Sequence, residues 1–143
     1  MSSIVIDTNI MSLYDAPIEP SYAELFRWLE KTGVLYVSQH LLTEYGRTGN
    51  QNIMILLAQL GKHAGNNRII KISKDDIKMF KDDKRTKYTC NKEDINHARL
   101  TFLSPRKKMI TEDGKLTKDI NRFKKVSGIK PSAVEKPDAS YYV

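Results

Sequence analysis

The sequence of 143 residues is poor in cysteine and has no long apolar run. Its only cysteine, Cys90, excludes an internal disulfide and fits a reducing compartment. No segment reaches about 18 consecutive apolar residues, and no charged N-terminal region precedes an apolar one, so we expect neither export nor contact with a membrane. These absences predict a cytoplasmic protein. Because internal repeats and low-complexity segments are also missing, we expect residues 1–143 to form a single domain with a sizeable core.

Charge is unevenly distributed along the chain. Residues 1–60 contain 3 Lys or Arg and 6 Asp or Glu, whereas residues 61–143 contain 21 and 11, and the net charge of the whole chain is +7. A basic half beside an acidic half favours a polyanionic partner, of which nucleic acid is the commonest. A lysine-rich solvated face is the alternative, and charge alone does not decide between the two.

The N-terminal segment combines a short apolar run with polar residues. Ile4 to Ile6 are β-branched and too few for a helix, which is typical of a strand buried on both faces in a parallel sheet. Asp7, Thr8 and Asn9 follow at once. Ligands of open α/β sheets bind beyond the carboxyl ends of the strands, so Asp7 is a candidate metal ligand or general base. Its structural alternative is a turn or cap.

Apolar strands and amphipathic helices alternate through most of the chain. This alternation predicts a three-layer α/β/α sandwich with a mainly parallel central sheet. The segment 53–60 is apolar almost all round, which indicates burial in the core or against a second subunit and suggests a homodimer. We expect strands at 4–6, 34–37, 68–72 and 107–111, helices at 22–31, 38–46, 51–64, 73–80, 91–103 and 117–126, and a C-terminal edge strand or tail at 129–143.

Four acids fall at or near the carboxyl edge of this expected sheet: Asp7, Glu44, Asp94 and Asp113. Carboxylates that converge resist ionising together, so such a cluster needs a divalent cation, and oxygen ligands select Mg²⁺ or Mn²⁺ over softer metals. Each acid also has a structural alternative. Glu44 could be an ordinary exposed helix residue, Asp94 could complement a helix dipole, and Asp113 could belong to an Asp-Gly turn.

The same residues resemble the PIN domain, a compact metal-dependent nuclease family, and in particular its single-domain toxin-like members. The resemblance spans nearly the whole chain and rests on four motifs: Ile4-Val5-Ile6-Asp7-Thr8-Asn9, Val37-Ser38-Gln39-His40-Leu41-Leu42-Thr43-Glu44, Asp94-Ile95-Asn96-His97-Ala98 and Ile110-Thr111-Glu112-Asp113. It implies that Asp7, Glu44, Asp94 and Asp113 are catalytic and bind one or two Mg²⁺ or Mn²⁺ ions, supported by Asn9 and Thr111.

The resemblance also implies an endoribonuclease that hydrolyses RNA phosphodiester bonds. Such a protein is either a toxin, which would have a protein antitoxin as partner, or an RNA-processing nuclease. From charge and position along the chain, we expect the RNA phosphates to contact four residues: Arg99, Arg106, Lys107 and Lys108.

Two other functions compete with this interpretation. A non-catalytic RNA-binding or assembly module could keep the fold without cutting, although retention of all four acids argues against it. A phosphoacceptor signalling domain of similar layout would have adjacent acids after the first strand and an Asp directly after the third. Asp7 stands alone, and Ser73 and Lys74 separate the third strand from the next Asp, so this function is disfavoured.

Overall fold

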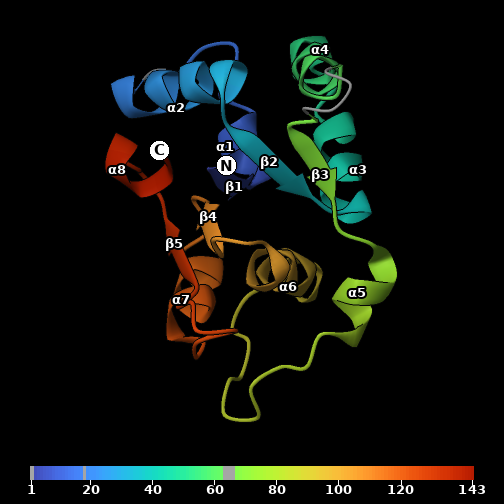
Figure 1. Ribbon diagram of the computed structural model, residues 1–143, viewed down its shortest axis with the longest axis vertical. Helices are drawn as coiled ribbons and strands as arrows, with labels where there is room; N and C mark the ends of the chain where they lie inside the picture. Colours follow the sequence, from blue (N-terminus) through green and yellow to red (C-terminus); the bar gives the residue numbers. More distant parts are fainter. Residues whose placement is uncertain (1, 18, 63–66) are drawn as a thin grey trace.

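The computed structural model describes residues 2–17, 19–62 and 67–143. Within these ranges, the centre of the molecule is a sheet of five parallel strands in the order β3-β2-β1-β4-β5 (Figure 1). The predicted α/β class with a parallel central sheet is confirmed. The strands are β1 (Ser3–Ile6), β2 (Val34–Val37), β3 (Ile69–Lys71), β4 (Lys108–Ile110) and β5 (Ser132–Val134).

Helices cover both faces of the sheet and give the predicted three layers (Figure 1). After β3 the chain returns past β1 to form β4, and right-handed crossovers then place the next helices on the opposite face. One face carries α1 (Thr8–Met11), α2 (Pro20–Lys31), α3 (Gln39–Arg47) and α4 (Gln51–Leu60). The other carries α5 (Lys74–Met79), the 3-10 turn η1 (Lys92–Asp94), α6 (Ile95–Leu103) and α7 (Gly114–Arg122), and α8 (Ala139–Tyr142) packs against α2.

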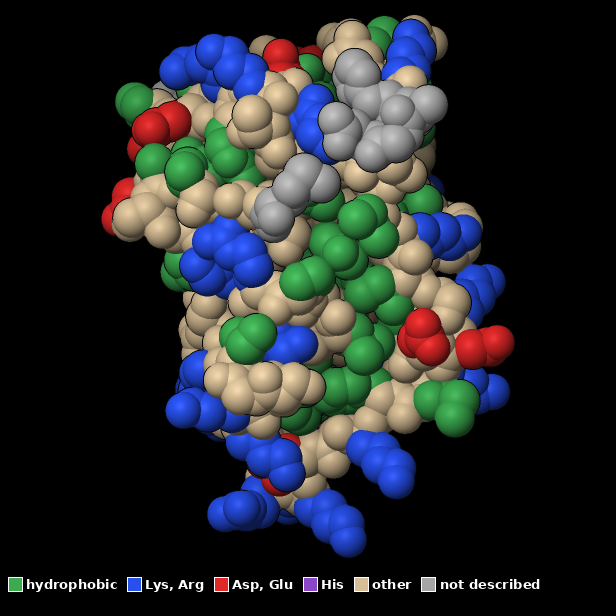
Figure 2. All heavy atoms as spheres, viewed as in Figure 1, with side chains coloured by type: hydrophobic (Ala, Val, Ile, Leu, Met, Phe, Trp, Pro, Cys, Tyr) green, Lys and Arg blue, Asp and Glu red, His purple; other side chains and the backbone are tan. Residues whose placement is uncertain are grey.

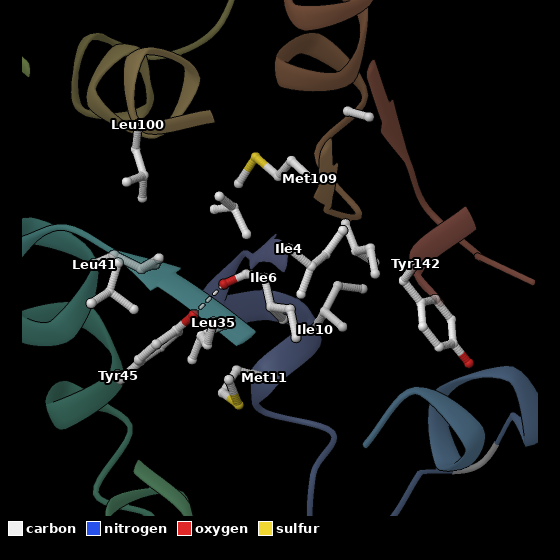
Figure 3. Close-up of a cluster of buried hydrophobic side chains, with 14 of the residues drawn as sticks. Ile4, Ile6, Ile10, Met11, Leu35, Leu41, Tyr45, Leu100, Met109 and Tyr142 are labelled. Carbon is white, nitrogen blue, oxygen red and sulfur yellow. Dashed lines mark hydrogen bonds between the residues drawn. The ribbon is translucent and has the colours of Figure 1, made fainter. Parts of the chain in front are cut away.

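The strand that precedes Asp7 lies at the centre of the core. Ile4, Val5 and Ile6 are at most 1% exposed, as the β-branched run predicts. Figure 3 shows β1 surrounded by apolar side chains from α1, α3, α6, α8, β2 and β4. Since full burial of one such side chain stabilises a fold by about 1.5–3 kcal/mol, the position of β1 is strongly determined.

Several element boundaries differ from the prediction. The last long helix begins at Gly114 and ends at Arg122, not at 117–126, because Asp113 caps it by accepting hydrogen bonds from the backbone of Lys115 and Leu116. A short helix, α1, follows β1 directly where only a turn or cap was expected, with Asp7 as its N-cap. The C-terminal segment supplies β5, a parallel edge strand beside β4, and then α8.

Helix α4 is buried on one side only. It ends at Leu60, and residues 63–64 of the predicted helix lie outside the described ranges. Ile53, Leu56 and Leu60 face the core, whereas Met54 and Ile55 are 38% and 54% exposed. An apolar strip therefore remains at the surface of α4. None of the helices in the described ranges is long and apolar enough to span a membrane.

Candidate metal centre at the sheet switch point

The candidate site lies where the strand order reverses. The chain runs outward from β1 through β2 to β3 and then returns to the other side of β1 as β4, so β1 and β4 flank the switch point of the sheet. Ile6 and Ile110 pair at the carboxyl ends of these two strands. Open α/β sheets bind ligands at this place, because the chain segments that follow the two adjacent strands turn to opposite faces of the sheet and leave a crevice.

Asp7 is held at this point by hydrogen bonds from both strands. One carboxylate oxygen accepts from the backbone N–H of Thr8 at 2.8 Å, and the other accepts from the hydroxyl of Thr111 at 2.6 Å. The Thr111 hydroxyl also accepts a hydrogen bond from the backbone N–H of Asp113 at 3.0 Å. Asn9 accepts a hydrogen bond from the backbone N–H of Glu112. These contacts fix the loop after β4 against the end of β1.

Asp94 and Asp113 complete a group of three aspartates. Asp94 lies at the junction of η1 and α6, and Asp113 caps α7. Burial is the largest cause that raises the pKa of Asp94, to about 6, and the negative charges of Asp7 and Asp113 add to it, whereas His97 acts in the opposite direction. The charges of Asp7 and Asp113 therefore act on Asp94, as expected for carboxylates at the same edge of the sheet.

Glu44 faces two histidines instead of the three aspartates. One of its oxygens accepts a hydrogen bond from the Thr8 hydroxyl at 2.8 Å, and both lie 3.0 Å from Nε2 of His97. His40, one turn earlier on α3, has its Nε2 3.1 Å from Glu44. Burial acts to raise the pKa of Glu44, but the hydrogen bonds and charges of His97, Thr8 and His40 outweigh it and lower that pKa.

The interaction between Glu44 and His97 also changes the pKa of His97. Burial opposes a positive charge on this ring, yet its hydrogen bond and charge interaction with Glu44, together with Asp7 and Asp94, raise its pKa. Sequence reasoning did not identify His40 as part of the site. The available signal was its spacing from Glu44, four positions that bring two side chains onto one helix face.

Tyr45 connects α3 to the end of β1. Its buried hydroxyl donates a hydrogen bond to the backbone carbonyl of Ile6, the residue that precedes Asp7 (Figure 3). The adjacent Glu44 is thereby placed beside Thr8. Thr8 then bridges the two groups of acids, since its N–H donates to Asp7 and its hydroxyl donates to Glu44.

Three of the four predicted phosphate-binding residues lie elsewhere. Arg106, Lys107 and Lys108 come before or at the start of β4, and hence at the opposite edge of the sheet from the aspartates. Arg106 and Lys108 donate to backbone carbonyls of α8, and Lys107 is buried with its ammonium on the carbonyl of Ser104. The prediction used charge and position along the chain, which do not show at which end of β4 a side chain lies.

Arg99 instead lines a pocket of about 400 Å³ between α3, α5 and α6. Lys74, Lys78 and His40 also line it, and no acid is found among its described lining residues. Arg99 is paired with Asp82 at 2.6 Å and stays partly exposed. Figure 2 shows further Lys and Arg side chains at the lower end of the molecule, over the loop between α5 and α6. A basic surface therefore lies next to His40, one of the two histidines that contact Glu44.

Comparison with known proteins gives a likeness to solved structures and no match in sequence. No family model matches the sequence. No curated protein matches it either. Among solved structures, a chain in the crystal structure of VapBC2 from Rickettsia felis bound to a DNA fragment from their promoter superimposes with a TM-score of 0.48. That match has 13% sequence identity and covers 92% of this chain and 98% of the other. The function proposed below therefore rests on the residues of the site itself.

Proposed function

We propose that this protein is a PIN-type endoribonuclease that depends on a divalent cation. The observations that support the proposal are the positions of Asp7 and Asp113 after the adjacent strands β1 and β4 at the switch point, and the effect of both charges on Asp94. Burial and these charges oppose the ionised form of Asp94, which is a cost to folding. Sites that keep carboxylates with such an unfavourable free energy of ionisation are more often functional than structural.

The donor set fits Mg²⁺ or Mn²⁺. All three side chains offer hard oxygen atoms, which these ions prefer, and a bound cation would offset both the burial and the repulsion that raise the pKa of Asp94. When bound there, a divalent cation supplies the charge stabilisation and water activation that phosphodiester hydrolysis needs. Glu44 is engaged by Thr8 and two histidines, so we assign the cation to the three aspartates and leave Glu44 beside them.

The remaining residues of the site hold these carboxylates in place. Thr111 donates to Asp7 and accepts from the backbone of Asp113, so a single hydroxyl sets the distance between two of the proposed ligands. Asn9 holds the loop that contains Glu112. One carboxylate oxygen of Asp113 accepts the hydrogen bonds that cap α7, and this contact orients the other oxygen. Such fixed donors preorganise a site before a ligand arrives.

RNA is the proposed substrate. The chain carries a net charge of +7, and the pocket lined by Lys74, Lys78 and Arg99 lies beside α6, the helix that directly follows Asp94. Cations in a groove contact phosphates without regard to sequence. Members of the family that the sequence resembles act as toxins held by a protein antitoxin or as RNA-processing nucleases, and the residues of this site fit both roles.

The test is cleavage of a mixed RNA pool in the presence of Mn²⁺. We expect the wild-type protein to cut and both Asp7→Asn and Asp94→Asn to lose cleavage. Glu93→Gln, an exposed neighbour on the same turn, should retain it. Cleavage by both aspartate variants at the wild-type rate would contradict the proposal. Tight RNA binding with no metal-dependent cleavage would instead favour the binding-module alternative, which the basic pocket also supports.

A further inference from the structure

A second set of potential metal ligands lies between α3 and α6. His40 and Glu44 stand on one face of α3, and His97 reaches them from α6. Their ligand atoms all lie within 4.8 Å of one another. Thr8 separates this set from the three aspartates. The set combines two imidazole nitrogens with a carboxylate, so its chemistry differs from that of the all-oxygen site.

The spacing of these atoms is close to that of a tetrahedral metal centre. Metal–ligand bonds of about 2.0–2.1 Å at tetrahedral angles place neighbouring ligand atoms roughly 3.3 Å apart. The Nε2 atoms of His97 and His40 lie 3.0 and 3.1 Å from Oε2 of Glu44. The ligand atoms of the two histidines also lie within 4.8 Å of each other, so all three side chains can reach one ion.

Hydrogen bonding within the described residues leaves part of this arrangement unexplained. Glu44 already accepts hydrogen bonds from Thr8 and His97. The Nε2 atom of His40 is buried beside Glu44 but makes no hydrogen bond of acceptable geometry to any described residue. His97 is fully buried, so its ring reaches no solvent. Buried polar groups of this kind normally have a partner.

We propose that His40, Glu44 and His97 form a binding site for Zn²⁺. Two nitrogens and one oxygen suit a borderline ion such as Zn²⁺ better than Mg²⁺. The side chain of His40 is 35% exposed and lines the basic pocket, which gives the ion a route from solvent. Three protein ligands leave a fourth position of a tetrahedral ion open to water or another ligand. Binding would also link α3 to α6. The site stands on its own geometry, whether or not the aspartates support cleavage.

Zinc affinity of the chelator-treated protein tests this proposal, measured by competition with a chromogenic chelator. We expect one strongly bound Zn²⁺, with affinity lowered roughly 100-fold or more by His40→Ala and by Glu44→Gln, because each removes a direct ligand. Thr43→Ala, an exposed neighbour on α3, is the matched control and should bind as the wild type does. His40 is partly exposed, so its truncation should leave the fold intact, which thermal unfolding checks.

The two metal sites can be separated with one more variant. Asp7→Asn should abolish Mg²⁺ binding and RNA cleavage but leave Zn²⁺ affinity unchanged, whereas His40→Ala should weaken Zn²⁺ and leave Mg²⁺ binding unchanged. In the Co²⁺-substituted wild type, a visible absorption band of tetrahedral cobalt should appear and should be lost in His40→Ala. Absence of stoichiometric Zn²⁺ binding, or Zn²⁺ affinity that survives both His40→Ala and Glu44→Gln, would overturn the proposal.

Discussion

Replacing Asp94 by asparagine should make the metal-free protein more stable. Burial and the charges of Asp7 and Asp113 raise the pKa of Asp94 from 3.8 to about 6, so its ionised form opposes folding. Converted in full at about 1.4 kcal/mol per pKa unit, this shift corresponds to about 3 kcal/mol. Asp94 is partly exposed, and screening by solvent reduces the figure to about 1–2 kcal/mol. Asp94→Asn removes this cost.

The pH dependence of that gain has a defined sign. The folded state binds the Asp94 proton more tightly than the unfolded state does, so protonation favours folding. The advantage of Asp94→Asn should therefore be complete above about pH 7, shrink as the pH falls through 6, and vanish near pH 4. Added Mg²⁺ should reverse the order, because it binds the folded wild type and not the variant.

Urea unfolding of the two proteins in chelator, at several pH values, measures this difference. Glu93→Gln is the control, since it removes an exposed acid from the same first turn and should change stability by no more than about 0.5 kcal/mol. An Asp94→Asn variant no more stable than the wild type at pH 7.5 would refute the reasoning. Burial and the charges of Asp7 and Asp113 would then not oppose the ionised form of Asp94.

Three further outcomes follow from other parts of the structure. Thr111→Val should destabilise the fold by about 1–3 kcal/mol in urea unfolding, because it removes the short hydrogen bond to Oδ2 of the buried Asp7 and leaves that oxygen only a contact of 3.4 Å from Asn9; no loss would show that the contact is unimportant. Lys74→Gln with Lys78→Gln should weaken RNA binding equally for all sequences and reduce its dependence on salt, and unchanged binding would exclude the pocket as the RNA path. If the apolar strip of α4 forms a dimer, Ile55→Glu should give a monomer by analytical ultracentrifugation, and a wild-type monomer at micromolar concentration would contradict the predicted dimer.

The fold was accessible from sequence because the strands are short apolar runs. Ile4 to Ile6 are β-branched and buried on both faces, so local pattern and tertiary packing agree. The start of α7 was not accessible in the same way. Asp113 and Gly114 form a dipeptide common in turns, and only the contacts of the Asp113 side chain with the backbone of Lys115 and Leu116 show that it caps a helix.

The sequence predicted where the residues of the candidate site lie along the sheet better than it predicted which side chains they contact. Asp7 and Asp113 follow adjacent strands, so the topology alone brings them to one edge. The direction of Glu44 depends instead on where Thr8 and His97 pack, and these residues are distant from it in sequence. For the same reason the sequence did not distinguish Arg99 from Arg106 and Lys108. Arg99 lines a pocket, whereas the side chains of Arg106 and Lys108 donate to backbone carbonyls at the opposite edge of the sheet.

The most direct test of the metal-dependent site is a Mn²⁺ titration that follows metal binding and cleavage of a mixed RNA pool together. Wild type and the double variant Asp7→Asn/Asp94→Asn would be compared under the same conditions. We predict that cleavage by the wild type rises with occupancy of the metal site, and that the double variant loses both binding and cleavage while keeping its fold. RNA cleavage that is independent of Mn²⁺, or that persists in the folded double variant, would contradict the proposed role of the three aspartates.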